Sequence, residues 1–239
     1  MNAYDKDLEP QLPSVAERIA TFQELSGRLG KERALWRYDP IVLSSDTPPA
    51  WHLDRLGAVG EALRGYTGRL TISFMDFYPK VQRRLAKVEE STGRRFYSAA
   101  EQGRERHDEV GELCRQIAAL GRELGVPVVS CGEPINLASY GIPAGACIDA
   151  ELIRRLRGGA GLAGRKDPNQ RPECLCTASV DIGAYNTCSH GCVYCYASFS
   201  PAMIKANLSR HRLDSPCLVG EVPLPTWICG VRFPGPYRR

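Results

Sequence analysis

Helices alternate with short strands along the first 160 residues, and this order constrains the fold more than any other feature of the sequence. Three segments have the composition of strands: 34–38, 70–77 and 126–131. Hydrophobic residues at helical spacing predict helices over 14–29, 48–63, 79–90, 98–124 and 149–157. Strands separated by helices run parallel in one sheet, so we predict an α/β fold.

The closed form of this pattern is the (β/α) barrel, which needs about eight strands. Three strands cannot close a barrel, so we predict a partial (β/α) barrel of the TIM type over residues 1–160, with parallel strands and flanking helices. A cysteine-rich, metal-binding segment is expected at 161–220, and a proline-rich tail follows at 221–239. We expect the chain to begin late in the barrel, which would leave strand 34–38 as an unpaired edge.

The composition excludes several classes of protein. With 239 residues, 43% of them hydrophobic, the chain can bury a substantial core. A formal net charge of +4 is too small to indicate a nucleic-acid partner. The first twenty residues contain no apolar run long enough for a signal peptide or a membrane span, so we expect a cytoplasmic protein without a membrane partner. Ten cysteines in such a protein point to metal rather than to disulfides.

Three cysteines near the end of the chain have the spacing of metal ligands. Cys188, Cys192 and Cys195 form a C-x3-C-x2-C pattern. One short loop with this spacing can offer three thiolates to three irons of a [4Fe-4S] cluster and leave the fourth iron open. Gly191 can adopt the positive φ that such a loop often needs. The alternative is a structural zinc site in which Cys174 or Cys176 is the fourth ligand.

Charged residues follow the predicted strands. Arg37 and Asp39 lie at the end of the first strand, Asp76 near the end of the second, and Glu133 after the third. In a barrel this rim carries the chemistry, although each residue could also be an ordinary cap or turn residue. We name Arg37, Asp39 and Glu133 as candidates for binding the polar groups of a cofactor or the substrate.

Several segments, in this order, resemble the domain of unknown function 1848 family over about residues 5–220. They are Trp36–Ile41, Cys131–Glu133, Cys147–Asp149, Lys166–Arg171, Cys174–Cys176 and Asp181–Ala197. The cysteine loop of that family is similar to the cluster loop of radical S-adenosylmethionine proteins. The stretch Cys188–Ala197 also resembles the loop of their spore-photoproduct-lyase-like members.

The resemblance to radical S-adenosylmethionine proteins implies a cofactor as well as a cluster. The open iron of such a cluster binds S-adenosylmethionine, and one electron then cleaves a carbon–sulfur bond of that cofactor. Tyr194 resembles the position that packs near the adenine of the cofactor, although it could equally be hydrophobic cover for the metal.

The family resemblance includes four cysteines outside the loop. Cys131 ends a predicted strand, Cys147 precedes a predicted helix, and Cys174 and Cys176 form a C-x-C pair. Four thiolates would complete either a second cluster or a tetrahedral zinc site. Alternatively, these cysteines are unliganded and pack as small hydrophobic side chains.

These observations predict an iron–sulfur protein, specifically a radical S-adenosylmethionine-like enzyme. Its partners would be a substrate that the sequence does not identify and an electron donor. Two other classes remain open. One is a redox module in which a fourth cysteine closes the cluster, and the other is a structural zinc protein without catalysis.

Overall fold

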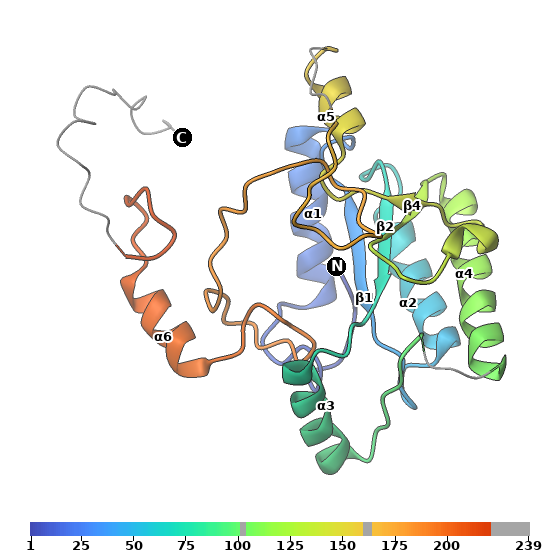
Figure 1. The fold of residues 1–239 in the computed structure, drawn as a ribbon, viewed down its shortest axis with the longest axis horizontal. Helices are drawn as coiled ribbons and strands as arrows, with labels where there is room; N and C mark the ends of the chain where they lie inside the picture. Colours follow the sequence, from blue (N-terminus) through green and yellow to red (C-terminus); the bar gives the residue numbers. More distant parts are fainter. Residues whose placement is uncertain (101–103, 160–163, 221–239) are drawn as a thin grey trace. The chain divides into compact units, whose positions relative to one another are not determined.

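The computed structural model describes residues 1–100, 104–159 and 164–220. The fold is α/β and contains one four-stranded parallel sheet (Figure 1). The strands are β1 (Trp36–Ile41), β2 (Leu70–Phe74), β3 (Val128–Cys131) and β4 (Ala144–Gly145). The helices are α1 (Val15–Leu29), α2 (Pro49–Ala62), α3 (Pro79–Thr92), α4 (Arg104–Leu124), α5 (Ala150–Leu156) and α6 (Pro201–Arg210). A short 3-10 helix, η1, covers Leu137–Tyr140.

The predicted class and the parallel pairing are confirmed, whereas barrel closure is not shown. The spatial order of the strands is β1-β2-β3-β4, so β1 and β4 are the two edges of an open sheet. The second strand ends at Phe74 rather than at residue 77. The first strand runs on to Ile41 through a cis Asp39–Pro40 peptide bond, beside a shift in its register with β2.

Strand β1 is an edge of the sheet, as predicted, and the first two residues of the chain cover part of it. The side-chain amide of Asn2 donates to the carbonyl oxygen of Asp39 at 3.0 Å, and its oxygen accepts from the Asp39 N–H at 2.8 Å. The amino group of Met1 donates to the carbonyl oxygen of Arg37. Because these groups occupy the hydrogen-bonding positions of a neighbouring strand, the first two residues cover this part of the edge.

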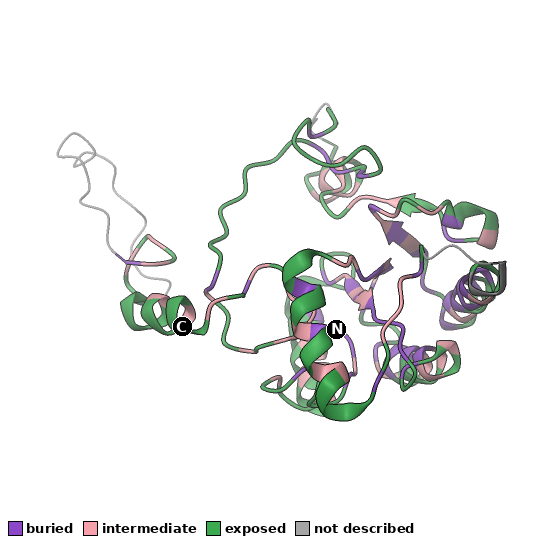
Figure 2. Ribbon diagram, turned by 60° about the horizontal axis from the view of Figure 1, so that its bottom comes forward, coloured by how far each residue is buried: buried purple, intermediate pink, exposed green. Residues whose placement is uncertain are grey.

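One face of the sheet builds the main core. Successive side chains of a strand point to opposite faces, and alternate residues of β1 and β2 are almost fully buried. They include Trp36, Tyr38, Leu70 and Ile72, which pack with hydrophobic residues of α2 and α4. In Figure 2 the buried residues accordingly concentrate in the strands and on one side of the helices. The opposite face carries polar side chains, among them that of Arg37.

The helices begin where the sequence supplies a start signal. In α1 the Ser14 side chain accepts from the Glu17 N–H, and the Glu17 carboxylate accepts from the Ser14 N–H. A proline occupies the first turn of α2 and of α3, where a missing N–H costs no hydrogen bond. Asp149 caps α5 by accepting from two backbone N–H groups of its first turn.

The chain divides into two compact units. Unit 1 comprises residues 1–181 and 190–196, and unit 2 comprises 182–189 and the chain from 197 onward, including α6. No helix among the described residues is long and apolar enough to cross a membrane. Residues 160–163, at the predicted boundary between the barrel and the cysteine-rich segment, and the predicted tail, 221–239, lie outside the described residues.

Candidate functional site

Polar groups lie at the end of the sheet where the carboxyl ends of all four strands meet; this end is called the edge below. Asp39 lies in β1, Asp76 two residues beyond β2, Cys131 at the end of β3 and Cys147 two residues beyond β4. The parallel pairing of neighbouring strands places all these ends at the same side. The rim that the sequence predicts therefore exists along an open sheet.

Arg37 supplies positive charge at this edge. Its Nε donates to Oδ2 of Asp39 at 3.0 Å, and its guanidinium also donates to Sγ of Cys147. Ser73 of the neighbouring strand donates to the other carboxylate oxygen of Asp39. Burial disfavours the charged guanidinium, but the Asp39 carboxylate outweighs this effect and raises the pKa of Arg37 above its ordinary value. The result is a fixed ion pair whose cationic end contacts a thiol.

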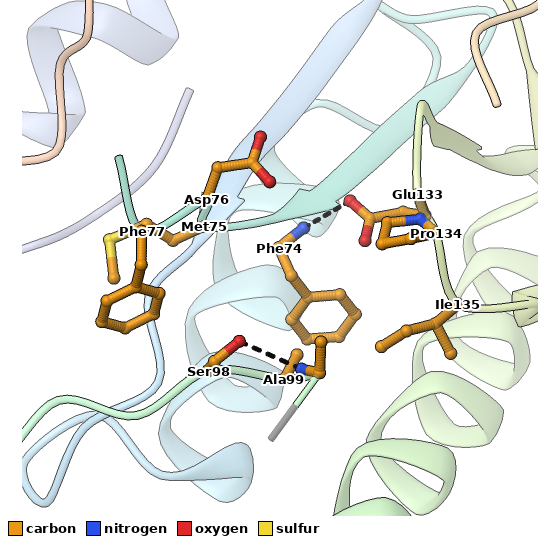
Figure 3. Close-up of a pocket in the computed structure, with 10 residues that line it drawn as sticks. Phe74, Met75, Asp76, Phe77, Ser98, Ala99, Glu133, Pro134 and Ile135 are labelled. Atoms are coloured by element: carbon orange, nitrogen blue, oxygen red, sulfur yellow. Dashed lines mark hydrogen bonds between the residues drawn. The ribbon is translucent and has the colours of Figure 1, made fainter. Parts of the chain in front are cut away.

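Glu133 lines a small pocket beside this edge (Figure 3). One of its carboxylate oxygens accepts the backbone N–H of Phe74 at 2.8 Å. Burial raises the pKa of Glu133 to about 7, although the Phe74 N–H opposes the shift. The pocket has a volume of about 70 Å³, and Ala99 and Ile135 are among its other lining residues. A carboxyl group that titrates near neutral pH in such a pocket can exchange a proton with a small ligand.

The Cys131 and Cys147 thiols meet near the carboxyl ends of β3 and β4, and Cys176 of the C-x-C pair contacts the residue that follows Cys147. The Sγ atoms of Cys131 and Cys147 are 2.7 Å apart, which exceeds the disulfide bond length of about 2.05 Å. Sγ of Cys176 accepts the backbone N–H of Ile148 at 3.4 Å. Burial raises the pKa of Cys174, and the neighbouring thiols of Cys176 and Cys131 contribute to that rise. Across the described ranges, no group of three or more His, Cys, Asp or Glu side chains could hold a metal ion as it stands.

Tyr194 anchors the later cysteine loop on the N-terminal segment of unit 1. Its hydroxyl donates to Oε1 of Glu9 at 2.5 Å and accepts from the Asn2 amide at 3.3 Å. Its ring lies edge-on to that of Tyr4, with 5.8 Å between the ring centroids. Tyr194 therefore packs into the protein and fixes the loop, while its predicted role near an adenine stays a prediction.

Arg84 of α3 fixes the turn that carries Cys192 and Cys195. The Cys195 N–H donates to the Cys192 carbonyl oxygen at 3.1 Å, which closes the turn, and Gly191 precedes it with a φ of +71°. The Arg84 guanidinium donates to the carbonyl oxygens of both cysteines, at 3.3 Å for Cys192. Nothing in the spacing of the sequence indicated Arg84, because it lies more than 100 residues before the loop.

Substitution Arg84→Gln is expected to loosen this turn, whereas Arg83→Gln is not. Arg83 is the matched control, since its Nε bonds a carbonyl oxygen of its own helix, that of Pro79. Loss of hydrogen bonds from a charged donor, worth about 1.5–3 kcal/mol each, should lower the hydrogen-exchange protection of the Cys195 amide roughly tenfold or more. Exchange measured by mass spectrometry on both variants tests this. Equal protection in the two variants would show that Arg84 does not hold the turn.

The third loop cysteine lies in the other unit. Cys188 belongs to unit 2, whereas Cys192 and Cys195 belong to unit 1. Convergence of the three Sγ atoms on one cluster therefore stays a prediction. In unit 2, Asn186 is nearly buried at a φ of 58°, and its side-chain oxygen accepts the N–H groups of residues 199 and 200 at 2.9 and 3.0 Å. In the sequence, an asparagine at a turn was the signal that could have predicted these hydrogen bonds of Asn186.

Comparison with known proteins yields one match. A family model described as "Domain of unknown function (DUF1848)" matches residues 1–197. Neither a curated protein nor a solved structure matches the chain significantly.

Proposed function

The chain belongs to the DUF1848 family, and we propose that this protein binds a [4Fe-4S] cluster through Cys188, Cys192 and Cys195 and acts as a radical S-adenosylmethionine-like enzyme. In this proposal the protein is cytoplasmic, and its sheet is the wall of a partial (β/α) barrel with the polar face turned inward. An electron donor and a substrate would be its partners.

The observation that carries the proposal is the position of the cysteine loop beside the strand ends. Asn2 bonds both the Asp39 carbonyl oxygen in β1 and the hydroxyl of Tyr194 in the loop. Beyond β2, the ring of Tyr78 lies 6.3 Å from that of Tyr196, measured between centroids. Residues 194 and 196 of the loop, which belong to unit 1, therefore lie near the carboxyl ends of β1 and β2, where parallel sheets bind their ligands.

The residues present suit an iron–sulfur cluster. Cys192 and Cys195 form no disulfide and are half-buried. Thiolates are the ligands that such clusters use. The guanidinium of Arg84, bonded to the carbonyl oxygens of both cysteines, places positive charge next to two ligands that would be negative. A bound cluster with one open iron would supply the electron that cleaves S-adenosylmethionine.

The residues at the strand ends would bind and orient what the cluster acts on. Arg37 and Asp39 form a fixed pair that offers charged hydrogen-bonding groups along the edge. Glu133, with its pKa raised to about 7 by burial, would hold or release a proton in the pocket that it lines. These roles assign binding and proton transfer to the protein and electron transfer to the cluster.

Anaerobic reconstitution tests the proposal. Full-length protein, a Cys192→Ala/Cys195→Ala variant and a Cys217→Ala control are incubated with iron and sulfide, desalted, and assayed for iron, sulfide and electron paramagnetic resonance after reduction with dithionite. We expect a cluster in the wild type and the control and none in the double variant. A double variant that retains the full iron and sulfide content would refute ligation by the loop.

Addition of S-adenosylmethionine distinguishes the two iron–sulfur hypotheses. An open iron predicts that the cofactor changes the resonance spectrum of the reduced cluster and that 5′-deoxyadenosine is formed. An unchanged spectrum without 5′-deoxyadenosine would favour the fully ligated redox module.

A further inference from the structure

The segment that follows β4 has few fully buried hydrophobic residues. Strand β4 contains only two residues, and α5 has no buried residue. Ile148 and Leu175, two large hydrophobic residues of this segment, are exposed. Small elements without a core of their own are commonly held together by a metal ion or by disulfides. A link of this kind would fasten residues 165–178 to the strand ends.

The backbone of this region brings Cys176 next to the residue that follows Cys147. Residues 165–178 fold back on themselves, since the Asp167 N–H donates to the Cys176 carbonyl oxygen at 3.0 Å, and residues 166 and 177 form an antiparallel bridge. The Thr177 N–H then donates to the Ile148 carbonyl oxygen at 3.0 Å, and the Ile148 N–H donates to Sγ of Cys176. Cys176 is thus paired with the residue that directly follows Cys147.

Arg69 and Gly132 fix the backbone next to Cys147 and Cys131. The Arg69 guanidinium binds the Asp149 carboxylate at 2.7 Å and the Ala146 carbonyl oxygen at 3.0 Å, so it holds the backbone on both sides of Cys147. Gly132 has a φ of +61°, a left-handed conformation that redirects the chain immediately after Cys131. The Cys131 and Cys147 thiols are consequently held in contact from two different strand ends.

We propose that Cys131, Cys147, Cys174 and Cys176 together bind one structural zinc ion that fastens the 165–178 segment to the carboxyl ends of β3 and β4. Four thiolates from two separate pairs are a complete tetrahedral ligand set for zinc. Binding must bring the second pair of thiols to the first, because the four thiols are not arranged around one point in the structure.

The spacing of the first pair favours a single ion over a second cluster. With Zn–S bonds of about 2.3 Å, two thiolates on one tetrahedral zinc lie about 3.8 Å apart. In a cubane each cysteine binds a different iron, so its ligands lie farther apart. The 2.7 Å between the Cys131 and Cys147 Sγ atoms needs only a small widening for zinc and a much larger one for a cubane.

The surroundings suit a zinc centre with four negative ligands. Such a centre carries two net negative charges, and the Arg37 guanidinium already donates to Sγ of Cys147. The backbone N–H of Ile148 donates to Sγ of Cys176. Donors of this kind stabilise thiolate ligands from outside the coordination sphere.

Metal analysis of the full chain, purified without added metal and dialysed against a weak chelator, tests the proposal. We expect one zinc per chain, released by an organomercurial thiol reagent, and X-ray absorption at the zinc edge should show four sulfur neighbours at about 2.3 Å. The Cys174→Ser/Cys176→Ser variant should retain less than roughly a tenth of the zinc, since half of the ligands are lost.

Two control variants separate this site from the cysteine loop. Cys192→Ala/Cys195→Ala and Cys217→Ser should both retain the full zinc content, and this result does not depend on whether the loop binds iron. The proposal would be overturned if wild-type protein held no tightly bound zinc, if its zinc had nitrogen or oxygen neighbours, or if it held iron in place of zinc. So would a Cys131–Cys147 disulfide found in anaerobically purified protein by peptide mapping. The absorption measurement on the wild type decides the question even if the double-serine variant fails to fold.

Discussion

Substitution Gly121→Ala is expected to destabilise the protein, whereas Gly57→Ala is expected to stabilise it. Both glycines lie inside helices, Gly121 in α4 and Gly57 in α2. A Cβ added at Gly121 would lie 2.2 Å from Cγ2 of Val128 and 2.9 Å from the carbonyl oxygen of Val126. A Cβ at Gly57 would meet nothing within 4 Å. Gly121 therefore permits the close approach of α4 to β3.

The two substitutions differ only in this contact, since each replaces a helical glycine by the best helix former. At Gly57 alanine should raise the free energy of unfolding by about 0.5–1 kcal/mol. At Gly121 overpacking should outweigh that gain and lower it by roughly 1–3 kcal/mol. Urea unfolding followed by circular dichroism measures both values. If both variants gained stability equally, α4 and β3 would have to be packed less closely than the structure shows.

The sequence predicted most of the fold because local signals agree with the final packing. The capping pair Ser14 and Glu17, the prolines Pro49 and Pro79 and the hydrophobic period place α1, α2 and α3 to within two residues at each end. In contrast, β4 contains two residues, which is too few for any alternation, and it exists only because β3 supplies its partner. Covering of the β1 edge by residues 1 and 2 is a tertiary effect of the same kind.

The candidate site was predictable as a set of strand ends but not as a set of contacts. Parallel topology implies that Arg37, Asp39 and Glu133 reach one edge. No local pattern, however, indicates that Arg37 donates to Cys147, a residue 110 positions away in the chain. Arg84 was missed for the same reason. It bonds to the backbone carbonyl oxygens of Cys192 and Cys195, and no sequence pattern predicts which side chain will bond to a backbone oxygen.

The two groups of cysteines differ in how the protein supports them. The loop is held by the Arg84 guanidinium, by the Tyr194 hydroxyl and by backbone hydrogen bonds of residues 190 and 193 with residues 11 and 8. Cys131 and Cys147 lie at or just beyond strand ends, and Cys176 is positioned by hydrogen bonds with Ile148 and its backbone. Because the two groups depend on different contacts, substitutions can test each of them separately.

Acidification from pH 7 to pH 4 is expected to remove stability through His52. This residue lies in α2 and is fully buried: its Nε2 lies 3.1 Å from the Val42 carbonyl oxygen and its Nδ1 lies 2.9 Å from the Tyr38 hydroxyl. A carbonyl oxygen only accepts, so Nε2 carries the proton and Nδ1 accepts from Tyr38. Burial lowers the pKa of His52 from 6.5 to about 4, so the folded protein holds the neutral ring.

The sign of the effect follows from proton binding. Between pH 6.5 and pH 4 the unfolded chain binds a proton at His52 that the folded protein does not, so the free energy of unfolding falls as the pH falls. A difference of about 2.5 pKa units corresponds to a loss of about 3 kcal/mol, complete below pH 4 and absent above pH 7.

Other groups titrate in the same range, so the quantity to measure is the difference in unfolding free energy between the wild type and a His52→Gln variant. Glutamine does not titrate, and the advantage of the wild type should therefore shrink steadily as the pH is lowered from 7 to 4. A difference that stays constant over this range would mean that His52 is not buried as the neutral ring.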